Sequence, residues 1–119
     1  MKKKPRFGFV VEYVKDVEAA KRFYVEVCGL EVERYHPTYV QFEHFAIAGD
    51  KPIGGEGGPE LYWLVDDAEA AFAEMSSKAE ISLPLAQKPF GKVFGFKNLD
   101  GRAHYFLELA KNRPSTPVK

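Results

Sequence analysis

The feature that most constrains this 119-residue chain is a short internal repeat. The segment that begins at Val14 reads VKDVEAA, and the segment that begins 51 positions later at Val65 reads VDDAEAA, with five identities in seven positions. Two helices can share Asp, Glu and Ala by propensity alone. Here, however, each copy follows a strand-like run, Phe7–Val14 or Glu60–Val65, and further strand-like runs come after it. The repeat therefore predicts two copies of one strand, helix and strands unit that together fill the chain.

The first copy of the repeat opens a segment that reads as a complete helix. Asp16 is a favourable N-cap residue, and Gly29 is a favourable stop. Apolar residues recur at the spacing of one helical face. We expect the following four to face a core: Ala20, Phe23, Tyr24 and Val27. A second helix is expected from Asp67 to about Lys78, with an apolar face of Ala68, Ala71, Phe72, Met75 and Ala79.

The remaining segments divide into strands, a joint and a tail. Strands are expected at Leu30–Tyr35, Tyr39–Phe42, Phe45–Ala48, Ile81–Leu85, Val93–Phe96 and His104–Leu109, with a loop at Gln87–Gly91. The glycine-rich stretch 51–59 is the predicted linker between one module at about 5–50 and a second at about 60–111. Together they form a single domain, 1–111, because the chain is too short for two cores. The polar residues 112–119 are predicted to be a flexible tail.

Composition excludes several classes of partner. Lysine plus arginine equal aspartate plus glutamate at 17 each, so no net field attracts nucleic acid or an anionic membrane. No apolar run approaches the roughly 20 residues of a membrane span. Nothing after Met1 resembles a secretory signal, and the single cysteine, Cys28, cannot form an internal disulfide. We therefore expect a cytoplasmic protein, and we interpret Cys28 as a buried, inert thiol.

Few residues stand out as candidates for catalysis. Glu12 interrupts the apolar first strand on the face shared by Val10 and Val14. It is either buried with a partner or turned out by a bulge, and an edge or interface residue paired with Lys or Arg is favoured over a catalytic role. His104 is expected to be a hydrogen-bonded strand histidine, and His36 a solvated turn residue. The spacing suggests no Ser/His/Asp or Cys/His arrangement, so no catalytic residue is predicted.

Two segments resemble the vicinal oxygen chelate superfamily, which contains glyoxalase I, bleomycin-resistance proteins and extradiol dioxygenases. They are YVKDVEAAKRFYVEVCGLEVER at Tyr13–Arg34 and FKNLDGRAHYFLEL at Phe96–Leu109. The resemblance implies an α+β fold of two βαβββ modules that form a cup-shaped sheet. It also implies a homodimer, because dimerisation commonly completes or encloses the site in this superfamily.

Metal-dependent members of the superfamily hold a divalent ion with side chains from the first and last strand of each module. Carried over, these positions fall on Phe9 and Ala48 in the first module, neither of which can bind a metal, although a shift of register would bring the nearby His44 into consideration. Glu60 is the matching first-strand residue of the second module, and Tyr105 or, after a longer turn, Glu108 is the last-strand residue. Two carboxylates make a poor site. We therefore expect no metal cofactor; the alternative is a divalent metal ion held by Glu60 and Glu108.

If the alternation of the strands is right, one set of side chains lines the cup. The set is Phe9, Val11, Tyr13, Glu60, Tyr62, Leu64 and Tyr105. An aromatic lining with one acid suits a small aromatic or amphipathic molecule that carries a cation or a hydrogen-bond donor, although these rings could instead simply pack a core. The first function predicted is thus a metal-free, bleomycin-resistance-like binding protein. The alternative is a metal-dependent lyase, isomerase or dioxygenase, and a purely structural dimer is a third class.

Overall fold

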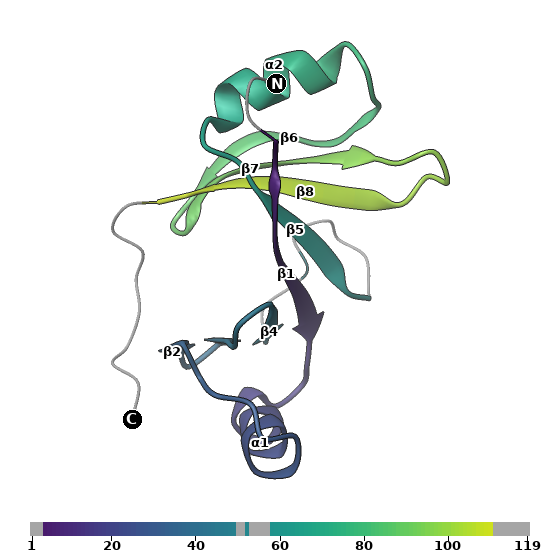
Figure 1. Ribbon diagram of the computed structural model, residues 1–119. Coiled ribbons are helices and arrows are strands. Elements are labelled where there is room, and N and C mark those ends of the chain that lie inside the picture. The colour runs from purple at the N-terminus through teal and green to yellow at the C-terminus, as the bar shows by residue number, and fades with distance from the viewer. Residues whose placement is uncertain (1–3, 50–51, 53–57, 111–119) are drawn as a thin grey trace. The chain divides into compact units, whose positions relative to one another are not determined.

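The structure, a computed structural model, describes residues 4–49, 52 and 58–110 (Figure 1). These residues fall into two units. The first module comprises the described residues from Phe9 to Pro59, and the second comprises those from Glu60 onward together with the residues up to Gly8. The predicted tail 112–119 and most of the predicted linker 51–59 lie outside the described residues.

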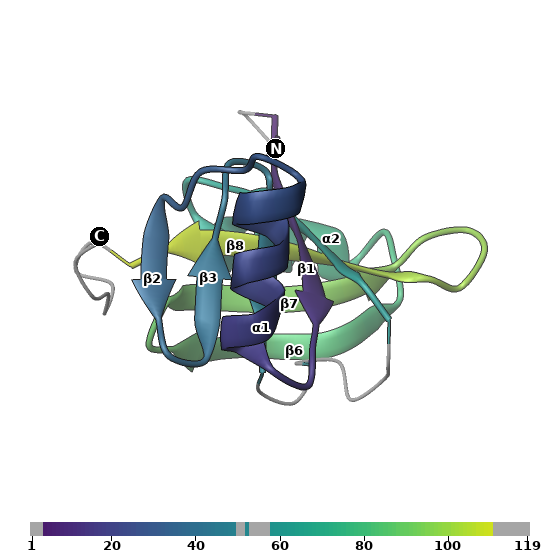
Figure 2. The ribbon, with the colours of Figure 1, turned by 90° about the horizontal axis from the view of Figure 1, so that it is seen from below.

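The first module is built from four strands and one helix. Its strands are β1 (Arg6–Tyr13), β2 (Arg34–His36), β3 (Tyr39–Gln41) and β4 (Phe45–Ala48). Its helix α1 (Val17–Arg22) continues as the π-helix η1 (Phe23–Val27). The first three residues of β1 belong to the second module. The strands lie in the order β2-β3-β4-β1, with β1 and β4 parallel and the other neighbours antiparallel. Figure 2 shows α1 over the strands of its module. The core between them consists of Val17, Val40, Phe42 and Ile47.

The second module repeats this arrangement. Its elements are β5 (Glu60–Leu64), α2 (Ala68–Ser76), β6 (Ile81–Lys88), β7 (Gly91–Lys97) and β8 (Ala103–Leu109). The strands lie in the order β5-β8-β7-β6, with β5 and β8 parallel. Helix α2 covers one face of these strands (Figure 1). The buried core there is Val65, Ala68, Ala71, Phe94 and Phe106.

The internal repeat of the sequence is thus a repeat of structure. Asp16 and Asp67 both act as N-caps, accepting hydrogen bonds of 3.0 Å from the backbone N–H groups of Ala19 and Ala70. Each carboxylate thus accepts from a backbone N–H group that has no partner within the first turn of its helix. The prediction of an α+β chain with two βαβββ modules is confirmed.

The predicted core-facing side of the first helix is wrong at two of its four positions. Ala20 and Tyr24 pack on the core, but Phe23 is 51% exposed and Val27 is 69% exposed. The cause is the π-helical turn, in which the N–H of Cys28 bonds the carbonyl of Phe23, five residues back, at 3.3 Å. This wider turn rotates Val27 away from the side of the helix on which Tyr24 contacts the core. Phe23 lies about a quarter turn from Tyr24 around the helix axis, so its side chain also points away from the core. The same turn leaves Cys28 exposed, so the interpretation of a buried thiol is also wrong.

The strand boundaries differ most at two places. The expected strand Leu30–Tyr35 is reduced to Arg34–His36, whereas Ile81–Leu85 extends to Lys88 and uses part of the predicted loop. Strand β6 lies at the edge of its module, and Pro84 falls where its pairing with β7 shifts register, between Leu83 and Ala86. Such places tolerate proline in a strand. Within the described residues, no helix is both long and apolar enough to cross a membrane.

Candidate ligand-binding face

The candidate site of the second module begins at Glu60, the first residue of β5. Alternation along the strand places Glu60, Tyr62 and Leu64 on the face opposite α2, because Trp63 packs against the α2 core. Glu60 is only 5% exposed, and Tyr62 is buried beside it. The phenol of Tyr62 donates a hydrogen bond of 2.9 Å to Oε1 of Glu60. A buried carboxylate is therefore fixed in position by a neighbouring ring.

Tyr105 of β8 extends this face across the sheet. The parallel register pairs Tyr105 with Tyr62, and their rings stack with centroids 5.2 Å apart and planes 26° apart. Across the next ladder Tyr105 faces Gly95 of β7. A Cβ atom at Gly95 would lie 2.9 Å from the Tyr105 ring and 2.6 Å from the hydroxyl oxygen of Ser82. The missing side chain makes room for the ring.

Neither Gly95 nor Ser82 was expected at this face from the sequence. The signal for Gly95 was present, since glycine inside a strand marks a close approach of another group. Ser82 carried no such signal, because its place beside Gly95 depends on irregular pairing of β6 with β7.

The other predicted lining residues lie in the first module. Phe9, Val11 and Tyr13 alternate along β1 and share one face, opposite the α1 side to which Glu12 points. Beside them the register places two alanines, Ala46 against Val11 and Ala48 against Tyr13. The seven predicted residues are thus brought together as two groups, three on the first module and four on the second.

A polar residue that sequence reasoning missed lies on the same face of the first module. Gln41 of β3 pairs with Ala46, is 7% exposed, and accepts a hydrogen bond from the phenol of Tyr39. Gln41 and Glu60 are the two buried polar or charged residues among those that the structure describes. Each belongs to the helix-free face of its own module.

Among the residues that the structure describes, the two predicted metal ligands do not form a site for a metal ion. Glu108 lies on the α2 face of β8, where its Oε1 accepts a hydrogen bond of 2.9 Å from the backbone N–H of Ala68. Glu60 lies on the opposite face, so the structure does not bring the two carboxylates together. The prediction that Ala48 is the last-strand position of the first module is wrong. The residue equivalent to Tyr105 is Ala46, because Ala46 pairs with Val11 as Tyr105 pairs with Tyr62. Within residues 4–49 and 58–110, no group of three or more His, Cys, Asp or Glu side chains could hold a metal ion.

Glu12 has a partner of an unexpected kind. Its Oε1 accepts a hydrogen bond of 2.6 Å from the phenol of Tyr24, which extends from the helix. The expected partner was a lysine or an arginine. This hydrogen bond, with some burial and the charge of Glu12, raises the pKa of Tyr24 to about 12. Glu12 therefore links β1 to the helix of its module.

His104 is a hydrogen-bonded strand histidine, as expected. Its Nδ1 accepts from the indole N–H of Trp63 at 3.1 Å, so the neutral ring carries its proton on Nε2. The ring also stacks between Trp63 and Phe96. This histidine lies on the α2 face of β8 with Phe106, away from Glu60.

Comparison with known proteins identifies the fold. No family model matches the chain, and no curated protein matches it. Among solved structures, a protein of Legionella pneumophila described as an NAD-dependent benzaldehyde dehydrogenase has a TM-score of 0.72 at 20% identity, over 86% of this chain and 98% of that one. A glyoxalase/bleomycin resistance protein/dioxygenase superfamily member from Vibrio splendidus 12B01 has a TM-score of 0.65 at 22% identity, over 88% and 99%.

A third similar structure is the methylmalonyl-CoA epimerase of Streptomyces coelicolor, with a TM-score of 0.68 at 14% identity, over 92% of this chain and 97% of that one. Extradiol dioxygenases are similar over part of their length. At such identities the likeness establishes architecture and leaves the chemistry open. The chain therefore has the glyoxalase-like, vicinal oxygen chelate fold.

Proposed function

We propose that this chain is a cytoplasmic, metal-free binding protein of the glyoxalase/bleomycin-resistance type. Its ligand is a small aromatic or amphipathic molecule that carries a cation or a hydrogen-bond donor. The observation that carries the proposal is the buried Glu60 carboxylate beside the stacked rings of Tyr62 and Tyr105.

Each of these groups offers a cationic or aromatic ligand a different interaction. A carboxylate in low-dielectric surroundings attracts a cation far more strongly than one in water. The adjacent rings add flat apolar contact and an electron-rich face for the same cation. The hydrogen bond from Tyr62 holds the carboxylate in place, so little conformational entropy remains to be lost on binding.

The donor set also distinguishes this proposal from a metal-dependent enzyme. The first module offers Phe9 and Ala46 at the positions that correspond to Glu60 and Tyr105, and neither side chain has a lone pair to donate. Glu108 is engaged at the start of α2. Binding of an organic molecule requires none of these ligands.

The test is a ligand screen read by thermal melting and by the fluorescence of Trp63, the only tryptophan, which adjoins Tyr62 in β5. Each aromatic ammonium compound is paired with its neutral isostere. A ligand at a hundred times its dissociation constant stabilises the fold by about 2.7 kcal/mol, which is an easily measured shift. We expect the cationic member of a pair to bind more tightly.

Matched variants locate the binding. Glu60→Gln keeps the shape of the side chain and an acceptor for the Tyr62 hydroxyl. We expect it to lower the affinity for the cationic ligand at least about tenfold and to leave the affinity for the neutral isostere unchanged. Tyr35→Phe removes a phenol that donates to Glu18 on the surface of the first module, so it serves as the control and should change nothing. Binding that is indifferent to both Glu60→Gln and Tyr62→Phe would refute the proposal.

A further inference from the structure

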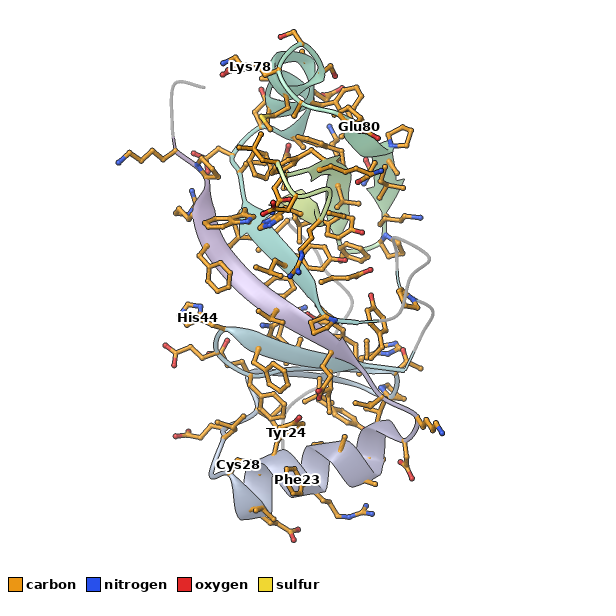
Figure 3. All side chains as sticks on the ribbon, turned by 90° about the vertical axis from the view of Figure 1, so that its right-hand side faces the viewer. Phe23, Tyr24, Cys28, His44, Lys78 and Glu80 are labelled. Atoms are coloured by element: carbon orange, nitrogen blue, oxygen red, sulfur yellow. The ribbon has the colours of Figure 1, made fainter. Side chains whose placement is uncertain are left out.

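The helix of the first module exposes an apolar surface, which we call the α1 surface. It consists of Phe23 and Val27, which lie four residues apart on one side of the helix, and the exposed Cys28 follows them. Tyr24, between them in sequence, points toward the strands of its module and packs on Phe45 (Figure 3). The α1 surface is therefore separate from the side of the helix that the core uses.

The second module shows that the fold does not require such a surface. The positions 51 residues after Phe23 and Val27 hold Glu74 and Lys78, whose charged groups form an ion pair of 2.8 Å. Met75, at the position of Tyr24, packs on its core as Tyr24 does. The same place in the repeat thus carries a solvated ion pair on one helix and two exposed apolar side chains on the other. Exposed apolar clusters of this kind mark interaction sites.

We infer that the α1 surface pairs with the α1 surface of a second copy of this chain. Charge complementarity selects this partner. Arg22 and Glu26, both exposed, lie four residues apart in the same helix and border the apolar side chains. A two-fold axis perpendicular to the helices makes them antiparallel, which sets Arg22 of one copy against Glu26 of the other, twice. An axis along the helices would make them parallel and bring like charges together, so the charges favour the antiparallel pairing. The border is self-complementary and has no net charge, so it gives no advantage to a strongly acidic or basic partner.

This pairing lies on the helix side of the first module, opposite the face of Phe9, Val11 and Tyr13, so it does not depend on the ligand proposal. The hydrophobic centre is Phe23 with Val27, and the two Arg22–Glu26 pairs set the direction of the helices. Such an arrangement has the apolar centre and polar border of known interfaces.

Sedimentation velocity of the full chain at micromolar concentrations tests the inference. We expect a dimer for the native chain. The double variant Phe23→Glu/Val27→Lys transplants the ion pair of α2 onto α1, which keeps helix propensity while removing the apolar centre. Its dimer dissociation constant should rise at least about tenfold. Leu99→Lys removes a fully exposed apolar residue from the turn before β8 and should leave the dimer unchanged.

A charge exchange identifies the partner as a second copy. Arg22→Glu alone sets like charges against each other and should weaken the dimer, and adding Glu26→Arg to the same chain should restore it. Circular dichroism checks that each variant is folded. A monomeric native chain, a dimer that tolerates Phe23→Glu/Val27→Lys, or a failure of the second charge change to rescue the first would each overturn the inference.

Discussion

Removing one hydroxyl group tests the link between Glu12 and the helix. In Tyr24→Phe the ring still packs on Phe42 and Phe45, but the carboxylate of Glu12 loses its 2.6 Å donor. The hydrogen bond is the largest of the causes that raise the pKa of Tyr24 from 10.0 to about 12, ahead of burial and neighbouring charge. Two pH units correspond to at most about 2.7 kcal/mol. Because Tyr24 is only partly buried, solvent screening reduces the expected contribution to about 1 kcal/mol.

The dependence on pH gives this prediction its direction. Folding favours the protonated phenol, so the contribution is fully present below pH 10 and is lost as the pH rises toward about 12. Urea unfolding of the native chain and of Tyr24→Phe should therefore differ by about 1 kcal/mol at pH 8, and the difference should shrink above pH 10. Tyr35→Phe is the control, because Tyr35 donates to Glu18 in an exposed place. A difference that stays constant from pH 8 to pH 12, or none at pH 8, would refute the reasoning.

The remaining predictions concern the backbone and are measured by urea unfolding. Gly91 has φ of +143°, and a Cβ atom there would lie 2.0 Å from the carbonyl oxygen of Glu108, so Gly91→Ala should cost about 3 kcal/mol or more. Gly101 has φ of +81° with open space around it, and Gly101→Ala should cost only about 1 kcal/mol; equal losses would contradict the steric argument. Asp67→Ala removes the N-cap of α2 and should cost about 1 kcal/mol, whereas Asp67→Asn should retain most of the stability. An Asn variant as unstable as the Ala variant would argue against capping.

Features governed by neighbouring residues were predictable from the sequence. Asp16 and Asp67 cap their helices because capping depends only on a carboxylate three residues from a free N–H group. The repeat was equally visible, because each module must bury one helical face and one sheet face with its own residues. The fold follows because these local signals occur once in each of the two modules.

Features set by longer-range contacts were not predictable. The π-helical turn that exposes Val27 includes a hydrogen bond from the N–H of Cys28 to the carbonyl of Phe23, which no spacing rule anticipates. The phenol partner of Glu12 required knowing which side of the helix meets β1.

The candidate site was predicted only in part for the same reason. Alternation along β5 predicted Glu60 and Tyr62 on one face, and the family resemblance added Tyr105, which the register of β8 pairs with Tyr62. Gly95 needed the register of β7, which follows from the short turn after Lys88. Gln41 lies on β3, and the lining was predicted only from the first and last strands of the modules.

The most direct test of the central claim, a binding face that needs no metal, is metal analysis of protein purified without added metal or chelator. Thermal melts with added Mn²⁺, Ni²⁺, Zn²⁺ and Fe²⁺ complete the measurement. The account predicts far less than one metal per chain and no stabilisation by any of the four ions, in the native chain and in Glu60→Ala alike. Near-stoichiometric metal that is lost in Glu60→Ala, or a melting temperature that rises with one of the ions, would contradict it.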